Sequence, residues 1–334
     1  MGMIHYKQRL SGEYIAFSVL SRLAVSPVGS LYFKRAKKRN PNSKLGRFWW
    51  HFYLVNYLLC GGFEQDKGEK KPISIEQIKE YHFQFYNVCF HTNCISHMVY
   101  EYANGNLPVV HDRFHIWNDF FQQPFGDLPT ERTASVKDGM LSARFALINP
   151  VSMRAWWKAT HAFVRLNEAA KQYIDEECSA ILRDSERVIG VVCRGTDYLI
   201  LKPHRHPVQP EVDDVIHLCR KWLRKYGYDK IYLATEDEKI YQKFEAAFPG
   251  QILTNKRSYY DKAMEKNGFR EITQVHFDRE NDDYYKGLEY LSSLYILSNC
   301  HALAGGNCGA SQMVTYLSNG KYERTHIFDK GLYK

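Results

Sequence analysis

The sequence predicts an α/β protein with a doubly wound parallel sheet in its C-terminal half. Short, continuous apolar runs alternate there with segments of helical periodicity, which is the pattern of buried strands covered by helices. The chain has 334 residues, more than one hydrophobic core usually holds, so we expect two globular units. Strand and helix signals also occur in the N-terminal half, and we therefore expect both units to have α/β character.

The N-terminal half begins with a segment rich in aromatic and basic residues that is predicted to be helical. Residues 73 to 86 are predicted to form a further helix after an exposed charged turn. Apolar side chains between residues 95 and 102 mark one face of a helix that Asn104-Gly105-Asn106 ends. Residues 107 to 110 are then typical of a buried strand.

The C-terminal half carries the clearest alternation. Residues 187 to 193 are typical of a strand buried on both faces, and residues 212 to 226 keep helical spacing until Gly227, which is placed to end the helix. The predicted elements continue as strand 231–235, helix 240–248, strand 251–254, helix 284–295, strand 302–306, a helix from Gly309 and strand 325–328. Ligands of such sheets bind at the carboxyl ends of the strands.

The charge and cysteine content limit the partners and the compartment. The formal net charge of +8 is moderate and lacks the dense basic striping of nucleic-acid-binding proteins, so no nucleic-acid partner is expected. Glu13 and Arg22 interrupt the only apolar candidate for a secretory signal, so we expect a cytoplasmic protein whose eight cysteines are free thiols.

Much of the positive charge is concentrated in one run. Its members are Lys34, Arg35, Lys37, Lys38, Arg39, Lys44 and Arg47. The run is either a solvated loop or, together with the aromatic residues 48 to 54 that follow it, a peripheral contact with an anionic membrane through residues 34 to 54.

Three predicted strand ends carry polar residues that suit a nucleotide. Arg194 follows the first strand, and an arginine there can bind a diphosphate bidentately without ever losing its charge. The alternative is an ion pair between Arg194 and Asp197 that only fixes the loop.

The second strand end is Thr235-Glu236-Asp237. Carboxylates at this point can bind a metal for a diphosphate, or accept hydrogen bonds from a base or ribose. Acidic residues are equally favoured in the first turn of any helix, and spacing alone does not decide between these roles.

The third strand end is the small-residue turn at residues 305 to 311. Small residues before a helix let backbone amides approach phosphate oxygens, and the helix N-terminus favours an anion. A lysine of the Walker type is missing, which argues against an ATP-hydrolysing P-loop.

Together these segments resemble the α-1,6-fucosyltransferases and their bacterial relatives. Residues 192 to 198 fall on the His-x-Arg-Arg-Thr-Asp-Lys element of that family, and His206-Pro207 lies at the matching distance. Residues 232 to 237, Tyr-Leu-Ala-Thr-Glu-Asp, closely copy the family's Tyr-Leu-Ala-Thr-Asp-Asp, and residues 297 to 300 resemble its third motif. Four ordered motifs at compatible spacing are more specific than any one of them.

The resemblance implies two Rossmann-like lobes in the glycosyltransferase B style. It implies transfer of fucose from GDP-fucose to a glycan acceptor with inversion, and no metal or other cofactor. Residues 1–75 would form an N-terminal helical segment, 76–185 an acceptor-side domain and 186–334 the nucleotide-sugar domain. Arg194 would bind the β-phosphate and help to expel GDP. The further donor-binding candidates are Asp237, Glu289, Ser293, Asn307 and Ser311.

The sequence departs from the family at positions that matter for catalysis. The family's histidine is Val192 here, and its second arginine is Gly195. The carboxylate that the family uses as a base falls on Lys202, which is normally charged at neutral pH and cannot accept a proton. Asp197 or His206 is a candidate to replace the base, and Lys202 to bind an acidic acceptor.

Two further departures concern donor binding. The acid that recognises guanine falls on Ser293, with Glu289 one helical turn earlier on the same face. The glycine-rich loop of the first domain is degenerate around residues 87 to 89.

The sequence is also compatible with two other functions. The losses at Val192, Gly195 and Lys202 also fit a degenerate relative that binds carbohydrate without turnover. Carboxylates at the second strand end also fit a metal-dependent glycosyltransferase.

Overall fold

The computed structural model describes most of the chain and separates it into two compact units. The described residues are 12–37, 43–60, 63, 78–83, 91–112, 116–126, 133–134, 149–183, 186–204 and 206–334. Unit 1 comprises Met1–Gln8, Glu168–Val314 and Lys321–Lys334, and unit 2 comprises Arg9–Asn167 and Thr315–Gly320. The three segments expected from the sequence, with boundaries after residues 75 and 185, stay a prediction.

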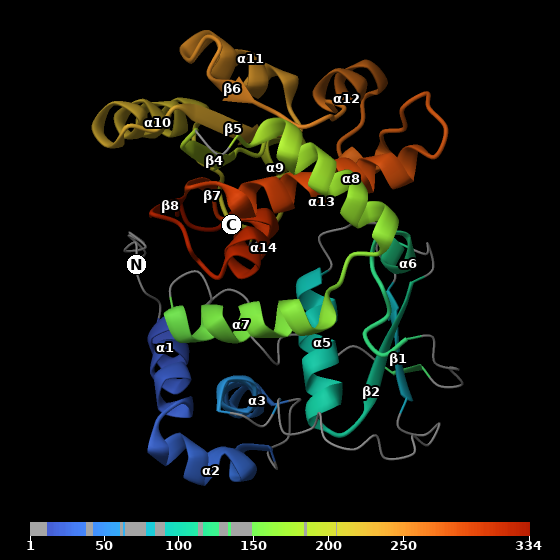
Figure 1. Cartoon of the computed structure of the whole chain (residues 1–334), viewed down its shortest axis with the longest axis vertical. Helices are drawn as coiled ribbons and strands as arrows, with labels where there is room; N and C mark the ends of the chain where they lie inside the picture. The colour runs from blue at the N-terminus through green and yellow to red at the C-terminus, as the bar shows by residue number, and fades with distance from the viewer. Residues whose placement is uncertain are drawn as a thin grey trace. The chain divides into compact units, whose positions relative to one another are not determined.

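Unit 1 is built on a five-stranded, fully parallel sheet in the order β6-β5-β4-β7-β8 (Figure 1). The strands are β4 (Val188–Val192), β5 (Lys230–Ala234), β6 (Ile252–Leu253), β7 (Ala302–Gly306) and β8 (Arg324–Phe328). β4 is central, and its last residue lies opposite Ala234 of β5 and Gly305 of β7. Chain order reverses between β4 and β7, and such a point leaves a crevice at the carboxyl edge of a parallel sheet.

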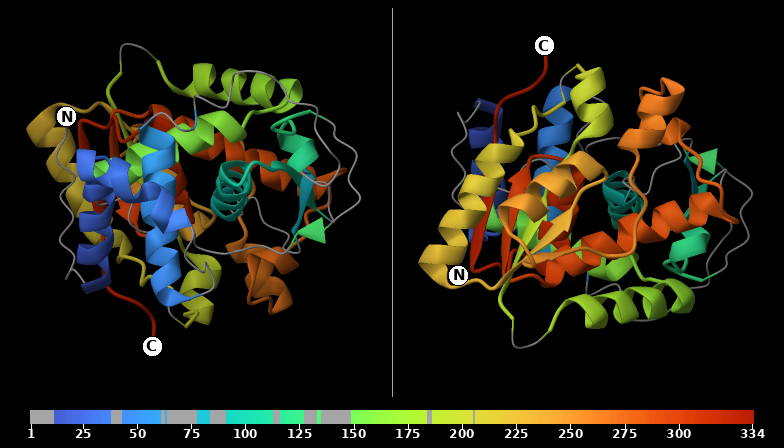
Figure 2. Two further views of the ribbon diagram at one scale, coloured as in Figure 1. Left: turned by 90° about the horizontal axis from the view of Figure 1, so that it is seen from below. Right: turned by 90° about the horizontal axis from the view of Figure 1, so that it is seen from above.

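Helices contact this sheet through alternate residues of β4. Ile189 and Val191 belong to the core formed with α10 and α11. A side chain at Gly190 would come within 3.0 Å of Leu297 in α13. Because successive strand residues point to opposite faces, α10 and α13 cover opposite sides of β4, as Figure 2 also shows. The predicted α/β class and parallel sheet are therefore confirmed.

The helices of unit 1 mostly follow the predicted order. They are α8 (Glu168–Ile181), α9 (Thr196–Leu201), α10 (Val212–Tyr226), α11 (Glu238–Ala247), α12 (Asp261–Asn267), the 3-10 helix η4 (Ile272–Gln274), α13 (Asp282–Asn299) and α14 (Gly309–Ser318). α10 ends as predicted, because Gly227 adopts φ 65° and donates its N–H to the carbonyl of Leu223. α9 was not predicted, since its six residues are too few to show a period.

Unit 2 combines helices with a small parallel sheet in the order β2-β1-β3. Its elements are α1 (Gly12–Ala24), α2 (Pro27–Lys37), α3 (Lys44–Leu59), β1 (Ile78–Phe83), α5 (His91–Ala103), β2 (Leu107–Asp112), α6 (Ile116–Phe120), β3 (Thr133–Ala134) and α7 (Pro150–Phe163). α3 lies in the angle between α1 and α2 and packs against both, as well as against α5 and α7 (Figure 1).

Two predictions for unit 2 were wrong. The described part of the predicted helix at 73 to 86 is the strand β1, which pairs with β2 on one side and β3 on the other. Aromatic residues in this run favour a strand, and a short apolar pattern does not separate the two periods. The aromatic run, which one of the two alternatives put at a membrane interface, is largely in the core, since Trp50, Phe52 and Tyr53 are at most 4% exposed.

Among the residues that the structure describes, the helices all lack the length and apolarity needed to cross a bilayer.

The pH dependence of stability tests the packing of α3. His51 is fully buried, with Nε2 2.9 Å from the hydroxyl oxygen of Ser21. Desolvation lowers the pKa of His51 from its ordinary 6.5 to about 3. The unfolded chain therefore takes up a proton first as the pH falls, and stability is lost from pH 6.5 down towards 3. Between pH 7 and pH 5 this one group should lower the free energy of unfolding by about 2 kcal/mol.

We predict that His51→Gln removes this part of the pH dependence while lowering stability at pH 7. Urea unfolding at pH 7 and pH 5, followed by circular dichroism, measures both changes. An identical pH dependence in the variant and the parent protein would show that His51 is not a buried neutral group.

Candidate functional site at the carboxyl edge of the parallel sheet

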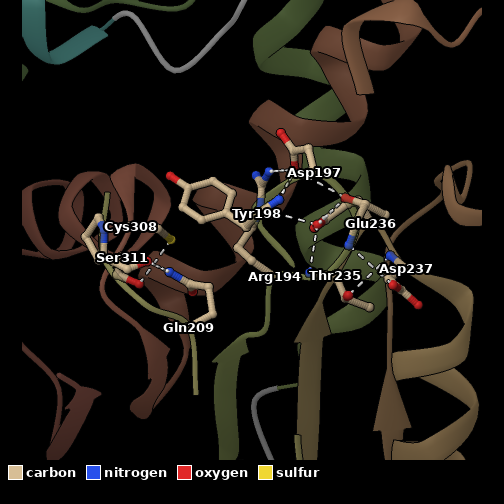
Figure 3. A network of polar contacts seen from close by, with 12 residues as sticks. Arg194, Asp197, Tyr198, Gln209, Thr235, Glu236, Asp237, Cys308 and Ser311 are labelled. Atoms are coloured by element: carbon tan, nitrogen blue, oxygen red, sulfur yellow. Dashed lines mark hydrogen bonds and ion pairs between the residues drawn. The ribbon is translucent and has the colours of Figure 1, made fainter. Parts of the chain in front are cut away.

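Arg194 emerges from the end of β4 and is held by two carboxylates (Figure 3). Its Nη2 lies 3.0 Å from Oδ1 of Asp197, and its Nε lies 3.3 Å from Oε1 of Glu236. The Arg194 side chain keeps 13% of its surface exposed. The ion pair with Asp197 that the sequence offered as the structural alternative is therefore present, and Glu236 adds a second one.

Glu236 and Asp237 accept hydrogen bonds from the loop between β4 and α9, and we call this pair of carboxylates the bracket. Oε1 of Glu236 accepts hydrogen bonds from the Gly195 amide and the Thr196 hydroxyl, each at 2.9 Å. Asp237 caps α11, where its Oδ1 accepts from the amide of Ile240 at 3.1 Å. The helix-capping role that the sequence left open is therefore realised by Asp237.

The bracket holds the loop in an unusual backbone conformation. Thr196 adopts φ 40°, a left-handed value that is rare for a β-branched residue. Such a conformation costs about 1–3 kcal/mol and persists only where the surroundings enforce it. A side chain at Gly195 would place its Cβ 2.4 Å from Oδ2 of Asp237. A side chain at this position, such as the second arginine of the fucosyltransferase motif, would therefore collide with the Asp237 carboxylate.

Tyr198 joins Arg194 to His206, a connection that the sequence analysis missed. The guanidinium carbon of Arg194 lies 4.9 Å from the centre of the Tyr198 ring. The His206 ring meets the same tyrosine at 6.1 Å, edge to face. Nδ1 of His206 lies 3.2 Å from the carbonyl oxygen of His204, which can only accept, so Nδ1 donates and a neutral ring has its lone pair on Nε2. In the sequence, the only indication of a role for Tyr198 is its position in the same loop as Arg194.

The turn after β7 lies at the same carboxyl edge of the sheet, on the side of Arg194 opposite Glu236 and Asp237 (Figure 3). In Figure 3, Cys308 and Ser311 lie on one side of Arg194, and Glu236 and Asp237 on the other. The turn approaches β4 closely, because a Cβ at Gly305 would lie 2.3 Å from the carbonyl oxygen of Val192. At the start of α14, a Cβ at Gly309 would have no atom within 4 Å, so this helix begins at open space.

Buried polar contacts fix the β7 turn internally. Gln209 donates from Nε2 to the carbonyl of Asn307 at 3.2 Å, and the Asn307 side chain is 8% exposed. Ser311 is fully buried and donates its hydroxyl to the carbonyl of Gly306 at 2.5 Å. Gln209, which sequence reasoning missed, lies where a Gly306 side chain would be, with Oε1 2.0 Å from the Cβ position. Asn307 and Ser311 therefore shape the turn, and their donor contacts stay a prediction.

The remaining predicted site residues have other surroundings. Lys202 is exposed at the end of α9, with φ 44°. Glu289 forms an ion pair with Arg279 at 2.5 Å and accepts from the Ser258 amide at 3.1 Å. Ser293 is 3% exposed and donates to the carbonyl of Tyr290 at 2.6 Å. The degenerate glycine loop at 87 to 89 lies outside the described residues.

The acidic residues offer few ligand groups for a cation. Within the part of the chain that the structure describes, one cluster has ligand atoms within 4.8 Å of one another, namely His276, Asp282 and Asp283. Asp282 is already paired with Arg279 at 2.7 Å and with Lys286 at 3.2 Å. Burial raises the pKa of Asp282, but hydrogen bonds from the Phe277 amide and these two cations outweigh it, so the net pKa is below its usual value. Glu236 and Asp237 are not in this cluster.

A shallow hollow of about 430 Å³ lies over the exposed face of α10. It is lined by His217, Arg220, Lys221, Arg224 and Lys225. These side chains are all exposed and differ from the residues that follow β4, β5 and β7. The basic hollow is therefore separate from the Arg194 network.

The close contact between Gly195 and Asp237 gives a stability prediction. Gly195→Ala should lower the free energy of unfolding by about 1–3 kcal/mol, because the methyl group displaces the bracket. Gly309→Ala is the matched control, since its Cβ meets nothing within 4 Å and should leave stability nearly unchanged. Urea denaturation measures both, and equal stabilities of the two variants would contradict the bracket.

Comparisons with known proteins give weak, consistent similarities. No known family profile matches the sequence, and no curated protein is significantly similar to it. Among solved structures the chain is similar to the fucosyltransferase NodZ from Bradyrhizobium, with a TM-score of 0.42 and 12% identity over 72% of this chain and 92% of that one. It is also similar to POFUT1 in complex with GDP-fucose, with a TM-score of 0.44 and 8% identity over 78% and 99% of the two chains. A mutant of Arabidopsis thaliana FUT1 in complex with GDP gives a TM-score of 0.44 and 8% identity, over 93% and 79%. The similar structures are thus fucosyltransferases, the class that the sequence motifs resemble.

Proposed function

We propose that this chain is an inverting, metal-independent glycosyltransferase that moves fucose, or a related hexose, from GDP-fucose to a glycan acceptor. In this proposal the two units form lobes in the glycosyltransferase B style, and unit 1 binds the donor. The observation that carries the proposal is the position of Arg194. It follows the central strand β4, beside the β7 turn, where the strand order reverses. The ordered motifs that resemble α-1,6-fucosyltransferases support the choice of donor.

In the proposed reaction Arg194 stabilises the leaving diphosphate. Breaking the bond between the anomeric carbon and the phosphate oxygen concentrates negative charge on GDP, and a fixed guanidinium offsets that charge. Asp197 and Glu236 repel an anion on their side of Arg194. The other flank offers the β7 turn and the open N-terminus of α14, whose backbone amides favour an anion. We therefore place the diphosphate between Arg194 and Gly309.

His206 is the proposed base. Inversion requires the acceptor hydroxyl to attack the anomeric carbon opposite GDP and to lose its proton to a base. Nε2 of His206 has a lone pair if Nδ1 donates to His204, and the ring is exposed. Asp197 is less suited, because its Oδ1 already accepts from Arg194 and from the Tyr198 amide, both at 3.0 Å. Asp197 then orients Arg194, and Lys202 stays a candidate for binding an acidic acceptor.

Metal independence is supported by the partners of the strand-end carboxylates. Glu236 accepts from Gly195 and Thr196, and Asp237 accepts from the α11 backbone. These bonds engage Oε1 of Glu236 and Oδ1 of Asp237, which leaves fewer oxygens for a divalent cation. The proposed electrostatic stabilisation comes instead from Arg194 and the α14 N-terminus.

Removal of the Arg194 guanidinium tests the donor site. Arg194→Ala should weaken GDP binding by about tenfold to a hundredfold, the value of one or two charge-assisted hydrogen bonds. Arg194→Lys should recover little, because a lysine cannot bind two phosphate oxygens side by side. Calorimetric titration with GDP in the presence of a chelator measures the binding, with UDP as the competing ligand.

Arg220→Ala is the matched control, since this exposed arginine on α10 lies outside the network. Its GDP affinity should equal that of the parent protein. Absence of heat with millimolar GDP, or equal affinities of Arg194→Ala and the parent protein, would rule out the donor site.

Substitution of His206 tests the base. His206→Gln should lower kcat for transfer while leaving the dissociation constant of GDP unchanged, because the histidine acts on the acceptor. A parallel loss of GDP affinity, or an unchanged kcat, would assign His206 a structural role.

A further inference from the structure

The net positive charge of the chain is confined to one segment. Residues 14 to 63 contain eight lysines and arginines and no aspartate or glutamate. The formal net charge of the whole chain is +8, so the remaining residues are balanced. This segment covers α2, α3 and all of α1 except Gly12 and Glu13. Arg22 of α1 and Arg35 of α2 are exposed.

α2 exposes an apolar stripe to solvent. Val28, Leu31 and Tyr32 are 56%, 76% and 47% exposed, and their spacing puts them on one side of the helix. Arg35 continues the same side, with its guanidinium carbon 5.4 Å from the Tyr32 ring. A surface helix normally turns such a stripe towards the core, so its exposure here is unusual.

α1 also exposes apolar side chains. Val19 and Leu23 are 50% and 45% exposed, and Val25, which follows the helix, is 38% exposed. Arg22 lies between them and is exposed. We call the set Val19, Leu23, Val25, Val28, Leu31 and Tyr32 the α1–α2 face.

A tight corner fixes the two helices of the face. The Ser26 hydroxyl accepts from the Gly29 amide at 3.2 Å, and Pro27 begins α2. A Cβ at Gly29 would lie 2.2 Å from the carbonyl oxygen of Leu23, so α2 touches the end of α1 directly. On the inner side, Asn56 of α3 donates to the carbonyl of Ala24 at 2.5 Å. Ala24 and Gly29 are thus buried at the corner, while the residues of the α1–α2 face are exposed.

We infer that the α1–α2 face docks on a bilayer that contains anionic phospholipids. Exposed apolar side chains beside Arg22 and Arg35, in a segment whose sequence has no acidic residue, match the acyl boundary and the charged headgroups of such a surface. A second copy of the chain is a poorer occupant, because a symmetric contact would bring the same net positive segment against itself. α1 and α2 have 13 and 11 residues, fewer than the roughly 20 that spanning needs, so the contact is interfacial. The aromatic run at 48 to 54 lies beneath this face instead of forming it.

Vesicle co-sedimentation of the purified full chain tests the inference. The chain should pellet with vesicles of phosphatidylcholine and phosphatidylserine, much less with phosphatidylcholine alone, and less as salt is raised. The double variant Val28→Ser, Leu31→Ser should lower the partition coefficient by about tenfold or more, because it removes exposed methyl and methylene groups from the interface.

Two controls remove similar groups from unit 1. Leu199→Ser with Ile200→Ser deletes apolar side chains that are 48% and 47% exposed. Arg220→Gln with Lys221→Gln neutralises part of the basic hollow on α10. Both variants should pellet like the parent protein, and circular dichroism confirms that all variants fold.

Three results would overturn the inference. They are failure to pellet with phosphatidylserine vesicles, equal pelleting of Val28→Ser, Leu31→Ser and the parent protein, and loss of pelleting in the α10 variant. A parent protein that is a dimer in sedimentation velocity, and a monomer after Val28→Ser, Leu31→Ser, would assign the face to a second copy. Pelleting does not depend on GDP binding or sugar transfer. The membrane inference can therefore fail while the proposed function holds, and the reverse.

Discussion

The carboxylates of Glu236 and Asp237 hold the loop after β4, and the proposed site depends on that contact. They accept from the backbone of Gly195 and Thr196, across 41 residues of sequence. The parallel register of β4 and β5 makes this possible, because Val192 lies opposite Ala234 and the two strands end together. The same contact positions Arg194, enforces the left-handed Thr196 and starts α11. Loss of the Glu236 carboxylate therefore removes a contact of the guanidinium itself, and loss of either carboxylate removes a support of the loop.

This bracket also explains why glycine stands at position 195. The Asp237 carboxylate fills the space beside its Cα, so a side chain such as the second arginine of the fucosyltransferase motif would not fit. Tyr198 adds an aromatic contact on the same loop, since its ring lies against Arg194 and His206. The loop thus keeps one arginine, supported by two acids and an aromatic ring. These contacts hold the charged guanidinium of Arg194 in one orientation. The proposed expulsion of GDP requires such a fixed positive charge.

Sequence patterns predicted unit 1 better than unit 2 for physical reasons. The continuous apolar runs at 187 to 193 and 302 to 306 indicated buried parallel strands, and Gly227 indicated the end of α10. The strand β1 was mistaken for a helix because its pairing with β2 and β3 is a tertiary property. Burial of the aromatic run in α3 was equally hidden, since aromatic residues suit cores and interfaces alike. Motif order selected Arg194, Asp197 and His206, whereas Tyr198 and Gln209 act through contacts that spacing does not reveal.

A crystal structure of the chain with GDP would locate the diphosphate relative to Arg194. We expect β-phosphate oxygens about 3 Å from the Arg194 guanidinium and close to the backbone amides at the start of α14. A diphosphate bound elsewhere, for example against Arg220 and Arg224 in the basic hollow of α10, with Arg194 still enclosed by Asp197 and Glu236, would contradict this expectation.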